Sequence, residues 1–107
     1  MTLDILLKSM IYYFYILECI NGNRYYGHTN DLARRIFEHS KCKVKSTKSK
    51  RPIRLVYFEE FDSRKDACRY EMKFKNGKTR KETIDKLIKG FPKSKCQGFN
   101  SQTAYGL

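Results

Sequence analysis

Two tyrosines and an arginine–histidine pair lie close together in the first part of the sequence and could handle protons and anionic charge. Tyr15 and Tyr25 fall on two aromatic, β-branched runs that flank the turn signal Asn21-Gly22-Asn23. Arg35 and His39 are separated so that a helix would place them on one face. Each residue alone is more simply explained by packing, a surface position or a helix cap, but their combination indicates a site.

Glu71 is a carboxylate within an otherwise apolar stripe of a later predicted helix. Because successive helical residues turn by about 100°, Ala67, Tyr70 and Phe74 fall on the same side as Glu71. A carboxylate beside an apolar stripe costs free energy unless it is paired or bound to a cation. The pattern leaves two explanations open: a salt bridge to Lys or Arg, or a metal site.

These residues would be positioned by a small α/β (α+β) domain. The sequence predicts strands at about 12–20, 24–29 and 53–61 and helices near 31–39, 63–75 and 79–89. The turn signal supports antiparallel pairing of the first two strands. The third, mainly apolar and β-branched with Glu59 and Glu60 near its end, is expected at the centre of the sheet.

Polar residues at the helix boundaries support this assignment. Asn30 or Asp31 is expected to cap the first helix, Asp62-Ser63 the second and Thr79 the third. Gly77 is expected just past the end of the second helix.

The motifs resemble the GIY-YIG nuclease family, specifically its small single-domain members related to the nuclease half of the excision-repair incision subunit. Tyr13-Phe14-Tyr15 occupies the position of the family's Gly-Ile-Tyr motif and shares only the tyrosine with it. Tyr25-Tyr26-Gly27 occupies the position of the Tyr-Ile-Gly motif. The motif that usually follows is matched by Thr29, Asp31, Leu32, Arg35 and His39. The resemblance extends to about Ile88 and implies a three-stranded, largely antiparallel sheet flanked by about three helices.

The resemblance implies an endonuclease that hydrolyses phosphodiester bonds in DNA, with DNA repair or recombination as its setting. By the family mechanism Tyr15 deprotonates or positions water, and Tyr25 contacts the phosphate or orients water. Arg35 would neutralise the scissile phosphate, and His39 would assist by hydrogen bonding. Free tyrosine has a pKa near 10, so a bound cation and nearby Lys and Arg are expected to lower the pKa of Tyr15.

Glu71 is the metal ligand that the resemblance implies, because Ala67, Glu71 and Lys75 match the family's Ala-x-x-x-Glu-x-x-x-Lys pattern. One divalent cation, Mg²⁺ or Mn²⁺, is expected, with water and phosphate completing its shell. No small-molecule cofactor is expected. His28 stands where repair-type members often carry lysine and is assigned to nucleic-acid binding.

The charge of the chain favours a polyanionic partner. The 107 residues include 23 Lys and Arg against 11 Asp and Glu, a formal charge of +12. A basic loop follows the candidate site, and phosphate contact is preferred over a merely solvated segment. Its cations are Lys41, Lys43, Lys45, Lys48, Lys50 and Arg51.

The domain is expected at residues 12–90, after a leader at 1–11 that is too short to span a membrane, and before a flexible tail at 91–107.

The four cysteines form no C-x-x-C pair, so neither a zinc site nor a disulfide framework is expected, and reduced thiols favour a cytoplasmic location. A partner protein could supply specificity.

Two other readings remain open on the sequence. The chain could be a basic nucleic-acid-binding module that has lost catalysis, or a small structural or ribosome-associated protein for which charge alone suffices. Nothing in the sequence distinguishes DNA from RNA or selects a substrate structure.

Overall fold

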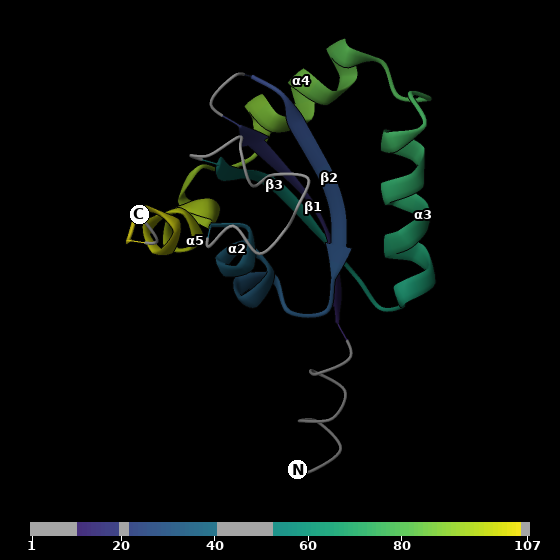
Figure 1. Cartoon of the computed structure of the whole chain (residues 1–107). Helices are drawn as coiled ribbons and strands as arrows, with labels where there is room; N and C mark the ends of the chain where they lie inside the picture. Colours follow the sequence, from purple (N-terminus) through teal and green to yellow (C-terminus); the bar gives the residue numbers. More distant parts are fainter. Residues whose placement is uncertain (1–10, 20–21, 41–52, 106–107) are drawn as a thin grey trace.

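The elements of the chain follow the order expected from the sequence, with one helix more. The computed structural model describes residues 11–19, 22–40 and 53–105, with only the backbone of 40 and 101–105. The elements are β1 (Tyr12–Cys19), β2 (Arg24–Thr29), α2 (Leu32–Ser40), β3 (Ile53–Phe61), α3 (Arg64–Lys75), α4 (Lys81–Gly90) and α5 (Ser94–Tyr105) (Figure 1). The predicted leader and basic loop lie almost entirely outside the described residues.

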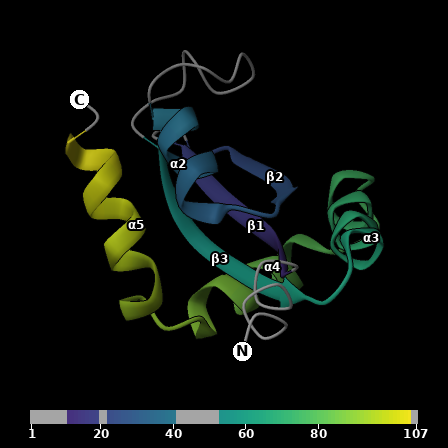
Figure 2. The ribbon, with the colours of Figure 1, turned by 90° about the horizontal axis from the view of Figure 1, so that it is seen from below.

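The strands form one antiparallel sheet in the order β2-β1-β3. The α+β fold and the hairpin pairing are therefore confirmed, whereas the expectation that the third strand is central was wrong. β1 is central, and its register sets Tyr15 opposite Gly27 and Leu17 opposite Tyr25. The apolar residues of the third strand are explained by its surroundings. Helices cover both faces of the sheet, and α5 lies along the outer edge of β3 (Figure 2).

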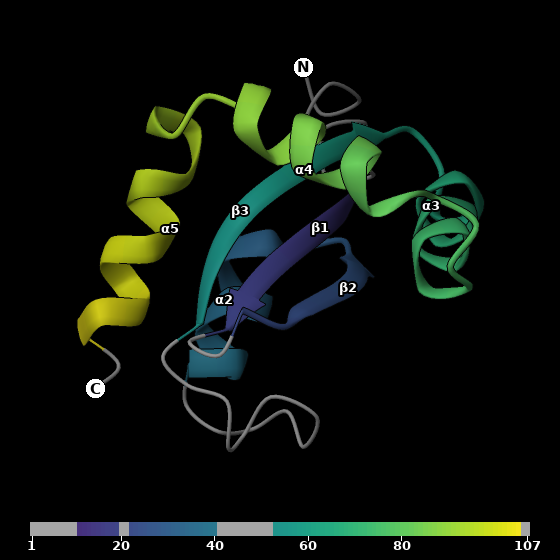
Figure 3. The same ribbon diagram turned by 90° about the horizontal axis from the view of Figure 1, so that it is seen from above.

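Alternate residues of β1 supply two separate cores. Tyr15 and Leu17 face α2 and α5, where they pack with Ile36 and Cys96. Phe14 and its neighbours face α3 and α4 in the second core, which includes Ile16, Tyr57, Phe74 and Ile84. Figure 3 shows α4 crossing over the sheet, as its apolar residues require. The two faces of the sheet thus carry different helices.

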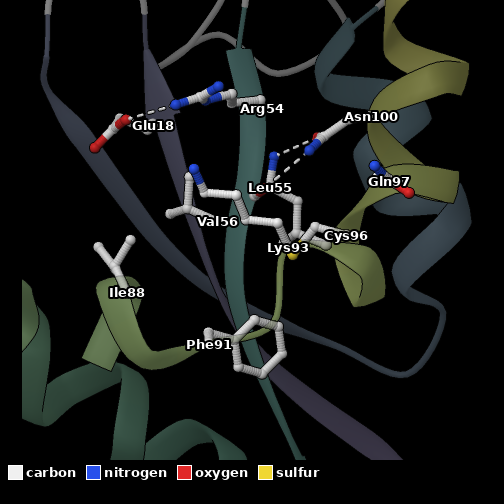
Figure 4. Close-up of a pocket in the computed structure, with 10 residues that line it drawn as sticks. All are labelled: Glu18, Arg54, Leu55, Val56, Ile88, Phe91, Lys93, Cys96, Gln97 and Asn100. Atoms are coloured by element: carbon white, nitrogen blue, oxygen red, sulfur yellow. Dashed lines mark hydrogen bonds and ion pairs between the residues drawn. The ribbon is translucent and has the colours of Figure 1, made fainter. Parts of the chain in front are cut away.

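The segment after Gly90, expected to be a flexible tail, continues into α5. Cys96 on this helix is buried against the first core. The side-chain amide of Asn100 accepts a hydrogen bond from Leu55 N at 2.7 Å and donates one to Leu55 O at 3.1 Å (Figure 4). A pocket of about 240 Å³ lies beside this contact. Asn100 therefore satisfies the edge of β3 as a further strand would.

Side-chain caps begin two of the helices. Asp31 Oδ1 accepts a hydrogen bond from Arg34 N, and Ser63 Oγ accepts one from Asp66 N. Gly77 follows α3 with φ of 71°, as expected for the residue past a helix end. The expected Thr79 cap was wrong: α4 begins after Arg80, and the Thr79 hydroxyl is buried without a hydrogen-bond partner among the described residues.

Within the described part of the chain, no helix is both long enough and apolar enough to cross a membrane. Cys19, Cys68 and Cys96 carry no disulfide. Cys42 lies outside the described residues.

Candidate active site

Tyr15, Tyr25 and His39 converge in the core between the sheet and α2. The Tyr15 hydroxyl lies 3.3 Å from His39 Nε2. The Tyr25 ring lies against the His39 ring with centroids 4.9 Å apart, and against the Tyr15 ring at 6.4 Å. Tyr15 and His39 are almost fully buried, whereas Tyr25 is partly exposed. The three residues thus extend from the interior to the surface, and Tyr25 is the outermost.

Gly27 makes room for the Tyr15 hydroxyl. It lies directly opposite Tyr15 on β2, and a Cβ at this position would collide with the hydroxyl and ring of Tyr15. A glycine inside a strand often marks such a close approach. Gly27 is therefore part of the site, although the sequence indicated it only as a motif position.

Arg35 is the fourth residue of the group formed by Tyr15, Tyr25 and His39. Its guanidinium lies near the Tyr15 hydroxyl and opposes the rise in the pKa of that group, and its Nη1 donates a hydrogen bond to Glu38 Oε1 at 3.0 Å. Burial acts to lower the pKa of Arg35, but these two contacts outweigh it and hold the pKa above its ordinary value. Arg35 thus carries a full positive charge next to the Tyr15 hydroxyl.

Burial controls the protonation of Tyr15 and His39. It raises the pKa of Tyr15 to about 12, although the nearby Arg35 guanidinium acts in the opposite direction. This differs from the expectation that surrounding cations lower the pKa, because the hydroxyl is inside the core. Burial, assisted by the charge of Arg35, lowers the pKa of His39 to about 4. At neutral pH, Tyr15 is protonated and His39 is uncharged, so Nε2 can accept the Tyr15 proton if the other ring nitrogen carries hydrogen.

Glu71 lies on α3, which packs on the opposite face of the sheet from α2. Its Oε1 accepts a hydrogen bond from His28 Nδ1 and its Oε2 one from Lys75 Nζ, each at 2.6 Å. Burial acts to raise the pKa of Glu71, but these partners outweigh it and lower the pKa. The carboxylate is therefore ionised, and of the two explanations that the sequence left open the salt bridge to a lysine is present, whereas the metal site stays a prediction.

The two halves meet around the exposed edge of β2. Lys75 Nζ lies 5.7 Å from the centroid of the Tyr25 ring, although the lysine also holds Glu71. The Glu71 charge acts on the Tyr15 hydroxyl and raises its pKa, although less than burial does. Tyr25 and Lys75 thus join the tyrosine half of the site to the carboxylate half.

The donor groups at Glu71 fit one hydrated divalent cation. The Glu71 side chain is 13% exposed and ionised, with an imidazole beside it. No cluster of three or more His, Cys, Asp or Glu occurs among the described residues. Mg²⁺ keeps several of its water ligands and needs only one or two carboxylates, so the residues suit such an ion. A cation would displace Lys75 or His28 from one carboxylate oxygen.

A polar cleft opens beside the site and contains residues that the sequence analysis missed. Its volume is about 520 Å³, and its lining includes Tyr12, Arg34 and Arg64 together with Arg35 and His28 of the site. Arg34 and Arg64 lie on different helices, and nothing in their spacing pairs them. The basic loop from Lys41 to Arg51 lies outside the described residues, so its assignment to nucleic-acid binding stays a prediction.

The chain matches a known domain family over most of its length. The family model described as "GIY-YIG catalytic domain" matches residues 11–85. The chain belongs to the GIY-YIG family, a family of nucleases, and the predicted resemblance is confirmed.

The relatives carry only a family designation. A UPF0213 protein of Pediococcus pentosaceus is 42% identical over 79 residues, which span 73% of this chain and 82% of the relative. Another, of Bacillus pumilus, is 38% identical over 74 residues, or 68% of this chain and 76% of the relative. The solution NMR structure of the UPF0213 protein BH0048 from Bacillus halodurans has 37% identity, covers 75% of this chain and 84% of that chain, and has a TM-score of 0.47.

Proposed function

We propose that this chain is a metal-dependent endonuclease that hydrolyses phosphodiester bonds in DNA. The observation that carries the proposal is the position of the Tyr15 hydroxyl, 3.3 Å from His39 Nε2 and under the charge of the Arg35 guanidinium. A structural tyrosine needs only one such partner. Here a proton acceptor and a fixed cation meet at one hydroxyl, and an ionised carboxylate lies around the edge of β2.

Proton removal is assigned to Tyr15 and His39 acting together. A tyrosine with a pKa of about 12 is a poor base by itself at neutral pH. With a pKa of about 4 in the resting core, His39 accepts the phenolic proton only when the negative charge of a bound phosphate raises that pKa; Tyr15 then takes a proton from water, and no free tyrosinate accumulates. Arg35 stabilises the negative charge that develops at Tyr15 and on the phosphate.

Glu71 is assigned to hold the divalent cation, most simply Mg²⁺ or Mn²⁺. Such an ion supplies positive charge to the phosphate and stabilises the leaving oxygen. Tyr25, partly exposed and covered by Lys75, is positioned to orient a phosphate oxygen or a water molecule. Lys75 provides a second cation at the same edge once it leaves Glu71.

An inactive binding module is the second candidate, and one observation favours it. Both oxygens of Glu71 are already hydrogen-bonded, and Tyr15 is 1% exposed, so the resting site offers neither group directly to a ligand. The catalytic proposal requires Lys75 or His28 to move when the cation and the nucleic acid bind. The two candidates make opposite predictions for cleavage.

The deciding experiment compares the wild type with Glu71→Gln on supercoiled and branched DNA in Mg²⁺, Mn²⁺ and EDTA. Glu60→Gln serves as the matched control because Glu60 is an exposed carboxylate on β3. Nicking is expected for the wild type and Glu60→Gln, and loss of about 10²-fold or more in rate for Glu71→Gln. Equal cleavage by wild type and Glu71→Gln would sink the proposal, as would undiminished cleavage in EDTA. Preference for branched over linear duplex DNA would support a role in repair or recombination.

A further inference from the structure

We infer that the polar cleft next to the site binds a phosphate that flanks the scissile one, held between Arg34 and Arg64. This inference rests on the proposed function, because it assigns a path to the same nucleic acid. It adds two binding residues from separate helices and fixes the direction in which the strand leaves the site. The cleft residues Tyr12, Arg34 and Arg64 are called the arginine cleft below.

The arginine cleft lies where two helices begin at the same end of the sheet. Figure 1 shows that the first turns of α2 and α3 both lie near the end of β2, where His28 and Thr29 are located. Arg34 lies in the first turn of α2, and Arg64 is the first residue of α3. The cleft of about 520 Å³ between them is large enough for a nucleotide unit and is continuous with Arg35.

The cations of the cleft are weakly neutralised by the protein. The Arg34 side chain is 60% exposed, and its nearest carboxylate oxygen, on exposed Asp31, lies 3.9 Å away. Such an exposed pair contributes little. Arg64 is exposed and has no ion pair with another described residue. Glu38, the remaining carboxylate of the cleft, is committed to Arg35. Two guanidinium groups are therefore available to an external anion.

The position of these arginines is unfavourable for the helices themselves. Positive side chains in a first helical turn oppose the helix dipole, and acidic residues are favoured there. α2 has no acidic residue in its first turn, although its capping residue Asp31 lies 3.9 Å from Arg34, and α3 has only Asp66 beside Arg64 and Lys65. The weak pair with Asp31 offsets little of the cost for Arg34, and Arg64 has no such pair among the described residues, whereas an anion bound between the two arginines would stabilise both.

The chemistry of the lining selects a phosphodiester over a small apolar ligand. Guanidinium groups hold phosphate oxygens through two parallel hydrogen bonds. The cleft is lined mostly by polar residues, and the partly exposed Tyr12 adds an aromatic ring to the lining. Aromatic rings in basic grooves stack on nucleic-acid bases. Arg35 and His28 line both the cleft and the site, so the anion in the cleft belongs to the same strand as the scissile phosphate.

The test measures equilibrium binding of a short DNA duplex in EDTA, so that no cleavage interferes. Arg34→Ala and Arg64→Ala are compared with Arg69→Ala and Arg54→Ala. Arg69 is an exposed arginine of the same helix as Arg64, outside the cleft, and Arg54 is 65% exposed on β3. All four variants remove one charge, so a general effect of net charge would affect them equally.

Each cleft variant is expected to weaken binding by about 3- to 10-fold and to reduce the log–log salt slope by about one. Arg69→Ala and Arg54→Ala should change affinity less than twofold. The melting temperature of Arg64→Ala should stay the same or rise slightly, because a charge opposed to the helix dipole is removed. Arg34→Lys and Arg64→Lys should recover the salt slope but only part of the affinity, since an ammonium cannot make the paired contact.

Equal affinities for the cleft and control variants would overturn the inference. The cleavage assay keeps its failure separate from that of the proposed function. If the wild type does not cut DNA but the cleft variants bind more weakly, the cleft stands and the proposed activity falls. If the wild type cuts DNA and the cleft variants bind as tightly as the controls, the activity stands and the cleft assignment falls.

Discussion

The Tyr15 hydroxyl lies inside the molecule, among His39, Arg35 and the backbone of Gly27. A surface tyrosine would gain a proton acceptor only by chance collision, whereas this one is fixed beside its acceptor by the packing of α2 on the sheet. Close packing has a second effect, because an interior tolerates little added volume. The glycine on β2 is therefore as necessary to the geometry as the groups that make hydrogen bonds.

Gly27→Ala is expected to displace the Tyr15 ring and to reduce cleavage by about 10²-fold, since misplacement by about 1 Å is enough for such a loss. The added methyl group should also destabilise the fold by about 1–3 kcal/mol through overpacking. Single-turnover rates and urea unfolding would measure both effects. Gly98→Ala is the control, because a Cβ there meets no atom within 4 Å. Normal cleavage by Gly27→Ala would show that the Tyr15 position is not critical.

His39 should make the stability of the protein depend on pH. Its pKa of about 4 in the folded state lies below the value of about 6.5 expected when unfolded. Between these values the unfolded chain binds a proton that the folded chain does not, so stability falls as the pH decreases from 7 toward 4. Protonation of this residue lowers the free energy of unfolding by about 3 kcal/mol in total. Below the pH at which His39 is protonated in both the folded and the unfolded state, it causes no further loss.

Urea unfolding of the wild type and His39→Gln at pH 7.5, 5.5 and 4.5 would measure this dependence. The variant is expected to be less stable at pH 7.5 but to lose less on acidification. The carboxylates make the same contribution to the pH dependence of both proteins. The difference between the two slopes of unfolding free energy against pH is therefore due to His39. Parallel slopes would mean that the pKa of His39 is the same in the folded and unfolded states, so that burial does not lower it.

Residue types and spacing in the sequence predicted the members of the candidate site but not their environment. Glu71 was recognised as out of place on an apolar stripe, which the contacts to His28 and Lys75 explain. The pKa of Tyr15 could not be predicted, because its direction depends on burial that only the packed core defines. Arg34 and Arg64 were missed for a similar reason: only the fold brings the starts of two helices together.

At the level of elements, α5 changes the role of β3. The strand pairs with β1 on one side, and on the other the Asn100 amide replaces a neighbouring strand by contacting both polar groups of Leu55. The boundaries of the strands and of the first three helices followed from turn signals and apolar periodicity. The helix at 94–105 did not, since it has few apolar residues and is stabilised mainly by contacts with β3 and α2.

Asn100→Ala is expected to destabilise the protein by about 1–3 kcal/mol, because it leaves the N–H and C=O of Leu55 without their partners. Gln97→Ala is the matched control, an exposed amide on the same helix. Urea unfolding would give the free energies, and hydrogen exchange would show faster exchange of the Leu55 amide only in Asn100→Ala. If both variants behave alike, the contact of α5 with β3 does not contribute to stability.

For the whole molecule, the excess of positive charge has a distribution as well as a size. The arginine cleft lies at the starts of α2 and α3, and the site extends from there along β2 to His39 in the last turn of α2 and Glu71 in the second half of α3. Exposed lysines also occur on α4, which lies at the other end of the sheet in Figure 1. A net charge of +12 would attract any polyanion, but only local cations can hold it in register with Tyr15.

Charge changes in the basic loop would distinguish attraction by net charge from local binding of phosphates. Changing Lys43, Lys45 and Lys48 to Glu alters the net charge as much as changing Lys81, Lys86 and Lys89 on α4. If the loop binds phosphates, the loop variant should bind DNA at least 10-fold more weakly than the α4 variant, and its salt slope should fall by about one unit for each phosphate that is no longer neutralised. Both should unfold like the wild type, since exposed charges contribute little to stability. Equal weakening of the two variants would mean that the loop acts only through net charge, and that the local phosphate binding comes from the arginine cleft alone.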